Sequence, residues 1–226
     1  MWEAAIPTEP VVKQTIAFVD GQNLYHAARK AFGYSYPNYD IQALASTICR
    51  TKSWHLIHTR FYTGIHDLSE DPWWYHFWIA KLAVMGRQGV QVCTRPVRYH
   101  NKRITLPDGT IHRFRIGEEK GIDVRIALDV IHMALRKEYD VAVIFSQDQD
   151  LAEVAEEIRS IAQEQGRWIK VACAYPVGPG TRNFRGIDKT DWIKIDKATY
   201  DACLDLRDYR PLPTRAQGRR PPKTTI

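Results

Sequence analysis

Residues 141–151 read Val-Ala-Val-Ile-Phe-Ser-Gln-Asp-Gln-Asp-Leu, and this stretch decides the predicted fold. Its five apolar residues make a short strand that is hydrophobic on both faces, as in a parallel sheet covered by helices. A helical pattern begins at Leu151, so Asp148 and Asp150 lie where the strand gives way to a helix. Ligands bind at the carboxyl ends of strands in open α/β sheets. The two carboxylates, with Ser146 beside them, are therefore either one wall of a divalent-cation site or helix-capping groups, and both interpretations stay open here.

The composition indicates a soluble globular protein with an anionic partner. The 226 residues are 44% hydrophobic and 26% charged, which suits one α/β domain with decorations. No run approaches the ~20 apolar residues of a membrane span, no secretory signal is recognisable, and the four cysteines lack metal or disulfide spacing. We therefore expect a cytoplasmic protein without a membrane partner. A net charge of +6 favours an anionic partner, and nucleic acid is the commonest.

Three parts are predicted along the chain. Residues 1–14 lack periodicity and are interpreted as a flexible lead-in. Residues 15–208 alternate strands and helices, which predicts a mainly parallel sheet with right-handed crossovers. Residues 209–226 are basic and rich in proline, and we expect them to be disordered. Strands are predicted over residues 15–19, 54–63, 89–97, 141–145, 168–174 and 192–195. Helices are predicted over residues 24–33, 40–50, 72 to 86 or 89, 123–135, 150–165 and 197–206.

Residues 95–116 interrupt this alternation and predict an inserted β-hairpin around the turn at residues 107–110. The segment is rich in cations: Arg95, Arg98, Lys102, Arg103, Arg113 and Arg115. A solvated face is the ordinary interpretation of such a run. An arm that contacts phosphates is the alternative, because the hairpin leads directly into residues 117–121. On that alternative we predict that Arg98, Arg103, Arg113 and Arg115 bind the substrate.

The helix predicted from residue 72 carries five aromatic residues between residues 73 and 78. They cannot all point inward on one helix. Core packing is the favoured interpretation, and a platform for stacking bases is the other. A homodimer formed through this helix is a further prediction.

The helix from Asp123 has a strong apolar pattern. Asp123 shares its face with Ala127, Val130 and Ala134, the face that is expected to meet the sheet. A carboxylate there is unusual unless the sheet edge is wet or binds a cation. Asp129 falls off that face, so a surface or secondary role is predicted for it.

The topology brings several polar residues to one edge. Because parallel strands end together, Asp20, Asn23, Asp148 and Asp150 are expected on one rim, which Asp123 can complete. Carboxylates this close repel one another unless a divalent cation joins them. Mg²⁺ or Mn²⁺ suits an all-oxygen site and can activate water for phosphodiester hydrolysis.

Three segments also resemble the signatures of a known family: Phe18-Val-Asp-Gly-Gln-Asn-Leu24, Glu119-Lys-Gly-Ile-Asp123 and Ser146-Gln-Asp-Gln-Asp-Leu151. Their order and spacing are similar to those of the NYN domain family, PIN-like metal-dependent ribonuclease domains that include the LabA-like proteins. The resemblance covers roughly residues 15–175. It implies a three-layer α/β/α fold with a central, mainly parallel sheet, and an Mg²⁺- or Mn²⁺-dependent ribonuclease acting on RNA.

The resemblance also implies roles for individual residues. The catalytic, metal-binding acids would be Asp20, Asp123, Asp148 and Asp150. Asn23 would support Asp20, Ser146 would orient the acidic loop, and Lys120 would lie near the phosphate. The third signature departs from the usual Ser-Gly-Asp-Ser-Asp-Phe, because Gln147, Gln149 and Leu151 replace glycine, serine and phenylalanine. All the acids of the signature remain, so metal binding is expected to be retained. The two glutamines are expected to affect how the substrate fits and how fast it is turned over.

Two other functions compete with the ribonuclease. One is a catalytically weak or inactive PIN-like module that binds RNA or a partner protein and serves regulation. The other is a phosphatase or a toprim-like DNA enzyme, since residues 148–150 also fit an Asp-x-Asp metal motif. A haloacid-dehalogenase phosphatase needs that motif after its first strand, where this chain has Asp20-Gly-Gln22, so the phosphatase is disfavoured.

Overall fold

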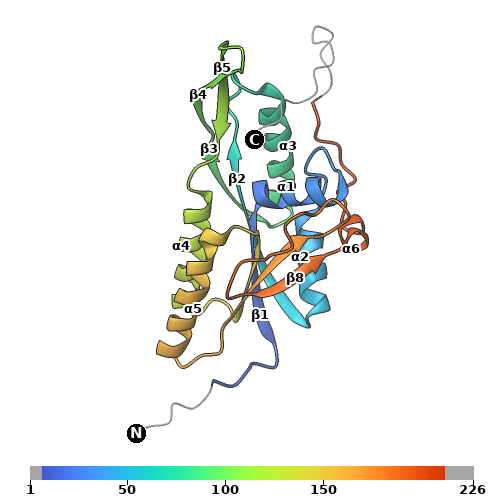
Figure 1. Cartoon of the computed structure of the whole chain (residues 1–226). Helices are drawn as coiled ribbons and strands as arrows, with labels where there is room; N and C mark the ends of the chain where they lie inside the picture. Colours follow the sequence, from blue (N-terminus) through green and yellow to red (C-terminus); the bar gives the residue numbers. More distant parts are fainter. Residues whose placement is uncertain (1–6, 212–226) are drawn as a thin grey trace.

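A six-stranded parallel sheet forms the centre of the protein (Figure 1). The computed structural model describes residues 7–211. The strands follow the order β3-β2-β1-β6-β7-β8. Their bounds are β1 Lys13–Asp20, β2 Trp54–Ile65, β3 Gln91–Pro96, β6 Val141–Phe145, β7 Lys170–Pro176 and β8 Asp191–Ile195. Val19 of β1 lies opposite Phe145 of β6, so Asp20 and Ser146 follow neighbouring strand ends.

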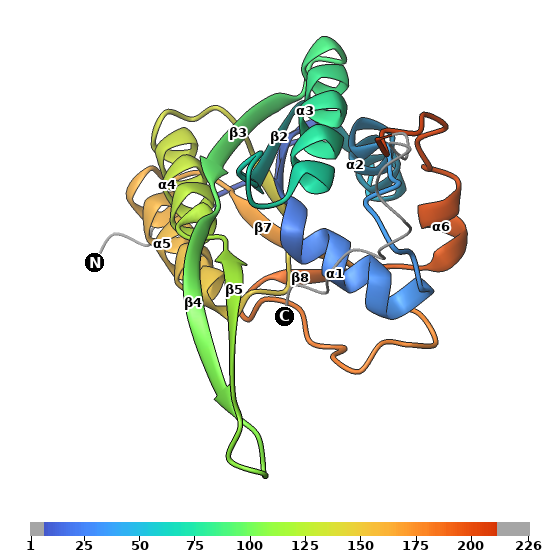
Figure 2. The same ribbon diagram turned by 90° about the horizontal axis from the view of Figure 1, so that it is seen from above.

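Helices cover both faces of this sheet (Figures 1 and 2). The helices α1 (Gly21–Phe32), α2 (Ile41–Thr51), α3 (Pro72–Arg87) and α6 (Lys197–Asp201) lie on one face, while α4 (Ile122–Leu135) and α5 (Ala152–Glu164) lie on the other. Successive residues of β6 pack alternately into the two cores, with Val143 on the α1 side and Ile144 on the α4 side. The predicted three-layer α/β/α class is confirmed, because a strand apolar at every position needs cover on both faces.

Local capping explains where the helices begin. The side chains of Asp20, Asp40 and Asp71 each accept a hydrogen bond from a backbone N–H three residues ahead, at the starts of α1, α2 and α3. Gly33 ends α1 in the left-handed conformation, with φ 84°. These signals lie within one turn of the helix, which is why the sequence predicts them well.

The aromatic residues of α3 mostly belong to the core. Trp74, Phe77 and Trp78 are buried, and Trp73 stacks on Phe77 with ring centroids 5.6 Å apart. The core-packing interpretation is confirmed for these rings. The homodimer stays a prediction.

The predicted surface position of Asp129 is wrong, although the residue does lie outside the candidate site. The residue is 6% exposed. Its carboxylate accepts hydrogen bonds from Arg60 and Tyr62 of β2, each at 2.8 Å, and pairs with Arg125 at 2.7 Å. The apolar pattern of α4 alone placed Asp129 off the buried face. A buried arginine on a distant strand supplies the counter-charge, which no local pattern reveals.

The ends of the domain differ from their predicted positions. The helix α6 ends at Asp201 instead of residue 206, and β1 already includes residues 13 and 14. Tyr209, placed in the predicted tail, donates a hydrogen bond to Asp205 at 2.7 Å and lies under the ammonium group of Lys81. The predictions for residues 1–6 and 212–226 lie outside the described residues. Between residues 7 and 211, no helix combines the length and the apolar character that crossing a membrane requires.

The inserted hairpin is confirmed as a separate antiparallel pair of strands. Its strands are β4 (Arg98–Thr105) and β5 (Ile111–Glu118), and they project away from the sheet (Figure 2). Directly paired residues share a face, so the register separates the predicted arginines. Arg98 lies on the face of Glu118. The opposite face carries what we call the arginine face: Arg103, Arg113 and Arg115.

Candidate functional site

A cavity of about 1100 Å³ opens at the carboxyl ends of the central strands. Its walls come from the end of β1, one side of α1 along most of its length, the segment that leads into α4 with the first turn of that helix, the loop after β6 and the loop after β7. Five predicted site residues line it: Asp20, Asn23, Lys120, Asp123 and Asp148. The parallel topology therefore brings one acid from each of the three sequence motifs to a single cavity.

Asp20 is the most buried of these acids, with 7% of its surface exposed. Its Oδ1 accepts a hydrogen bond from the backbone N–H of Asn23 at 2.9 Å, so it caps α1 as well as facing the cavity. Burial is the main cause that raises the pKa of Asp20 to about 6. The nearby carboxylates of Asp148 and Asp123 act in the same direction, and the hydrogen bond from the backbone N–H of Asn23 opposes them. Asp20 therefore both caps a helix and belongs to the cluster of carboxylates.

Glu119 is an acid of the cavity that sequence reasoning missed. Its side chain accepts a hydrogen bond from the backbone N–H of Gly64, at the end of β2. Burial raises the pKa of Glu119 to about 8, and the carboxylates of Asp20 and Asp123 contribute in the same direction. A Cβ atom at residue 64 would lie 2.6 Å from a Glu119 oxygen, so this contact requires glycine. The signal available in the sequence was the position of Glu119 directly before Lys120.

A set of hydrogen bonds shapes the acidic loop after β6, residues 146–151. The Oγ of Ser146, a buried residue, accepts from the backbone N–H of Asp148 at 3.1 Å, and Oδ1 of Asp148 accepts from that of Asp150 at 3.1 Å. Oδ1 of Asn23 accepts from the backbone N–H of Gln147 at 3.0 Å, which joins α1 to this loop. Ser146 thus lies beneath the cavity, and Asn23 holds the loop instead of contacting Asp20 through its side chain.

Asp150 lies apart from the other predicted acids. It is exposed in the short 3-10 helix η1 (Gln149–Leu151), which Asp148 caps, and it is not among the residues that line the cavity. Because the turn of η1 rotates residue 150 away from residue 148, the two carboxylates of the Asp-x-Asp motif do not share the cavity.

The donor chemistry of the cavity fits a hard divalent cation. Asp20, Glu119, Asp123 and Asp148 offer carboxylate oxygens, the ligands that Mg²⁺ and Mn²⁺ prefer, and a bound cation would offset their mutual repulsion. As placed within residues 7–211, no three His, Cys, Asp or Glu side chains stand close enough together to hold one ion. Binding would therefore have to draw these acids together.

Cations surround the acids of the cavity. Lys120 precedes α4, Arg29 and Lys30 lie on α1, and Arg182 lies in the loop after β7; all four line the cavity. The hairpin arginines are exposed and lie outside its lining. Arg115 pairs with Glu70 at 2.7 Å. An acidic centre with a cationic rim suits a polyanionic chain held beside a metal.

Comparison with known proteins gives one family and one similar fold. The family model of the NYN domain matches residues 14–176. A protein of unknown function from Vibrio parahaemolyticus is 22% identical over 84% of this chain and 98% of its own, with a TM-score of 0.50, a likeness of fold alone. Ribokinase from Giardia lamblia is 12% identical over 77% of this chain and 54% of its own, with a TM-score of 0.36, too low to support an argument. The comparison with curated proteins gives no match.

Proposed function

The chain belongs to the NYN domain family of the PIN-like nuclease superfamily, and from that premise we propose that it is a divalent-metal-dependent ribonuclease, a hydrolase of RNA phosphodiester bonds. One observation carries the proposal. Acids from three motifs that are distant in sequence, Asp20, Asp123 and Asp148, line the same cavity beside Lys120. An exposed capping role alone would not require them to converge.

Four carboxylates would hold the metal: Asp20, Glu119, Asp123 and Asp148. When bound, Mg²⁺ or Mn²⁺ would polarise the scissile phosphate and make a water molecule nucleophilic. Asn23 and Ser146 hold the loop that carries Asp148, so they act as positioning residues. Lys120 faces the cavity and would offset the charge that develops on the phosphate. Asp150, which is exposed, is assigned a supporting role through its backbone hydrogen bond to Asp148.

The hairpin would extend the binding surface beyond the cavity. The hairpin that carries the arginine face projects from the sheet (Figure 2), and its strand β5 leads through residues 119–121, which include Lys120, into α4. We assign it contacts with RNA phosphates away from the scissile bond, which strengthen binding without base recognition.

Cleavage of a labelled RNA in the presence of Mn²⁺ tests the proposal. We expect cleavage that EDTA abolishes and that Asp148→Asn and Asp123→Asn reduce by about 100-fold, at least the loss that follows when even an outer-shell partner of a metal is substituted. Glu164→Gln, an exposed acid at the end of α5, is the control and should cut like the parent protein. Equal cleavage by the parent and Asp148→Asn would contradict the assignment.

A second candidate function is RNA binding without cleavage. It is favoured by the spacing of the acids, because no three of the metal-ligating side chains within residues 7–211 stand close together. Binding of RNA with no cleavage in Mg²⁺ or Mn²⁺ would support this regulatory module over the enzyme.

A further inference from the structure

The loop between β7 and β8 forms one wall of the cavity. This wall comes from a part of the chain that lies outside the three sequence motifs. It covers residues 177–190, and Thr181, Arg182 and Asn183 line the cavity. Arg182 is exposed. Without contacts that fix its backbone, a polar loop of this length would not hold Arg182 in one position.

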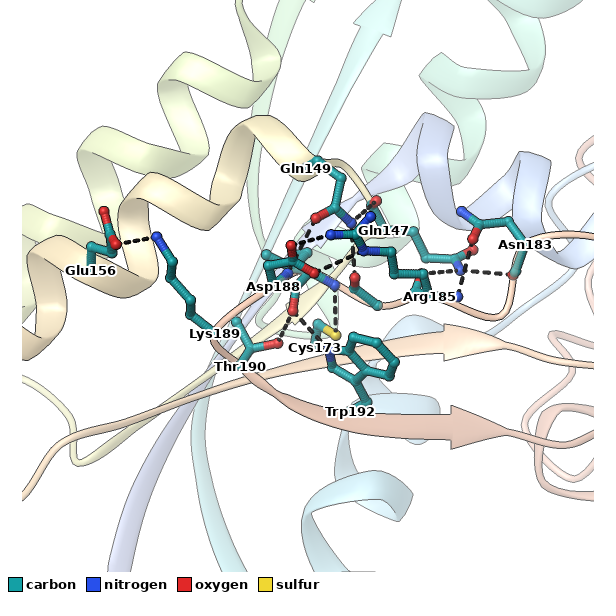
Figure 3. A network of polar contacts seen from close by, with 12 residues as sticks. Gln147, Gln149, Glu156, Cys173, Asn183, Arg185, Asp188, Lys189, Thr190 and Trp192 are labelled. Atoms are coloured by element: carbon teal, nitrogen blue, oxygen red, sulfur yellow. Dashed lines mark hydrogen bonds and ion pairs between the residues drawn. The ribbon is translucent and has the colours of Figure 1, made fainter.

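Two glutamines of the acidic loop hold this wall. Nε2 of Gln147 donates to the backbone oxygens of Asn183 at 3.1 Å and Arg185 at 2.8 Å. Nε2 of Gln149 donates to Gly186 at 2.8 Å, and its Oε1 accepts from the backbone N–H of Asp188 at 3.2 Å. Figure 3 shows both side chains reaching from the acidic loop into the loop after β7. At residue 147 a glycine would offer no side-chain donor, and at residue 149 a serine would be too short to reach these backbone groups.

The other end of the same loop is held by close packing on α1. A Cβ atom at Gly178 would overlap the backbone oxygen of Ala31, and one at Gly180 would overlap that of Lys30. The loop therefore rests on the C-terminal turn of α1 at one end and on the glutamines at the other. Residues 181–183 form the span between these anchors, over the cavity.

We propose that Gln147 and Gln149 are positioning residues that hold this span in place, so that Arg182 binds a backbone phosphate of the RNA. The identity of the ligand rests on the proposed function. Arg29 and Lys30 of α1 line the same cavity. An RNA strand bound there would therefore meet cations from α1 as well as from the loop after β7. A loop that is ordered before binding avoids the entropic cost of ordering Arg182 in the complex.

Hydrogen exchange in the free protein tests the anchoring directly. We expect Gln149→Met, which keeps the length of the side chain but removes its polar atoms, to accelerate exchange of the Asp188 amide about tenfold, the effect of losing one hydrogen bond. Gln165→Met is the matched control, because Gln165 bonds to Leu135 far from the cavity. Unchanged exchange across residues 181–188 in both Gln147→Met and Gln149→Met would overturn the proposal.

Salt dependence of RNA binding tests the consequence. A fluorescein-labelled single-stranded RNA is titrated in EDTA, where no cleavage occurs, at several salt concentrations. Arg182→Ala should lower the slope of log Kd against log salt by about 0.7, the value for one phosphate contact on a single strand. The double variant Gln147→Met/Gln149→Met should lower it by a similar amount although it removes no charge, and adding Arg182→Ala to it should have little further effect.

The outcomes separate this inference from the proposed function. Faster loop exchange with an unchanged salt slope would overturn the role in RNA binding, and so would additive effects of the glutamine and arginine substitutions. A parent protein that binds RNA without cutting it would remove the proposed hydrolysis and leave this inference standing. A parent protein without measurable affinity for RNA would overturn both.

Discussion

Asp20→Asn should stabilise the metal-free protein while it removes the proposed activity. The Asp20 carboxylate is buried beside Asp148 and Asp123, so its ionised form is unfavourable in the fold. Asparagine can keep the hydrogen bond from Asn23 that caps α1, because its side-chain oxygen also accepts. The substitution thus removes the charge and retains the local structure.

The size of the effect follows from the pKa. The folded-state pKa of Asp20 is raised from 3.8 to about 6, so the unfolded chain loses its proton first as the pH rises. The contribution of Asp20 to stability is therefore fully present below about pH 4 and is lost as the pH rises through 6. At about 1.4 kcal/mol per pH unit, the loss in the parent protein reaches about 3 kcal/mol at pH 8 and about half of that at pH 5. Asp20→Asn should gain these amounts.

Urea unfolding in EDTA at pH 8 and pH 5 measures the difference. Asp40→Asn is the control, because Asp40 caps α2 through the same hydrogen bond and lies outside the cavity. The free energy of unfolding of Asp40→Asn should differ little from that of the parent protein at either pH. If Asp20→Asn is no more stable than the parent protein at pH 8, or if its gain does not shrink at pH 5, the reasoning about buried repulsion is refuted.

Three further predictions concern the metal, the hairpin and the core. Mn²⁺ at 100 times the Kd of the parent protein should raise the free energy of unfolding of that protein by about 2.7 kcal/mol. At the same Mn²⁺ concentration Asp148→Asn should gain less, and equal gains would argue against a metal site at these acids. Replacing the arginine face with alanine should lower the salt slope of RNA binding by about 0.7 for each phosphate that the hairpin no longer binds, and an unchanged slope would make the hairpin scaffolding. Asp129→Ala leaves the buried Arg60 without its partner and should cost about 3–5 kcal/mol in urea unfolding, while a destabilisation below about 1 kcal/mol would contradict that role.

The features that the sequence predicts are those whose cause lies nearby in the chain. Apolar runs identify the strands β1 and β6, and the aspartates at residues 40 and 71 identify helix starts through bonds to their own next turn. The turn at residues 107–110 identifies the hairpin. The order of the motifs and the parallel topology also predict that Asp20, Asp123 and Asp148 meet, because the ends of neighbouring parallel strands share one edge.

What only the tertiary structure decided is which side chains meet across long distances in the chain. Glu119 joins the acids because its segment packs on Gly64, and Asp150 leaves them because a single 3-10 turn rotates it outward. Asp129 is buried because Arg60, 69 positions away, reaches it. Gln147 reaches backbone groups 36 and 38 positions further on. Periodicity and capping report neighbours within a few residues, whereas these contacts depend on how whole elements pack, and that information appears only once the chain is folded.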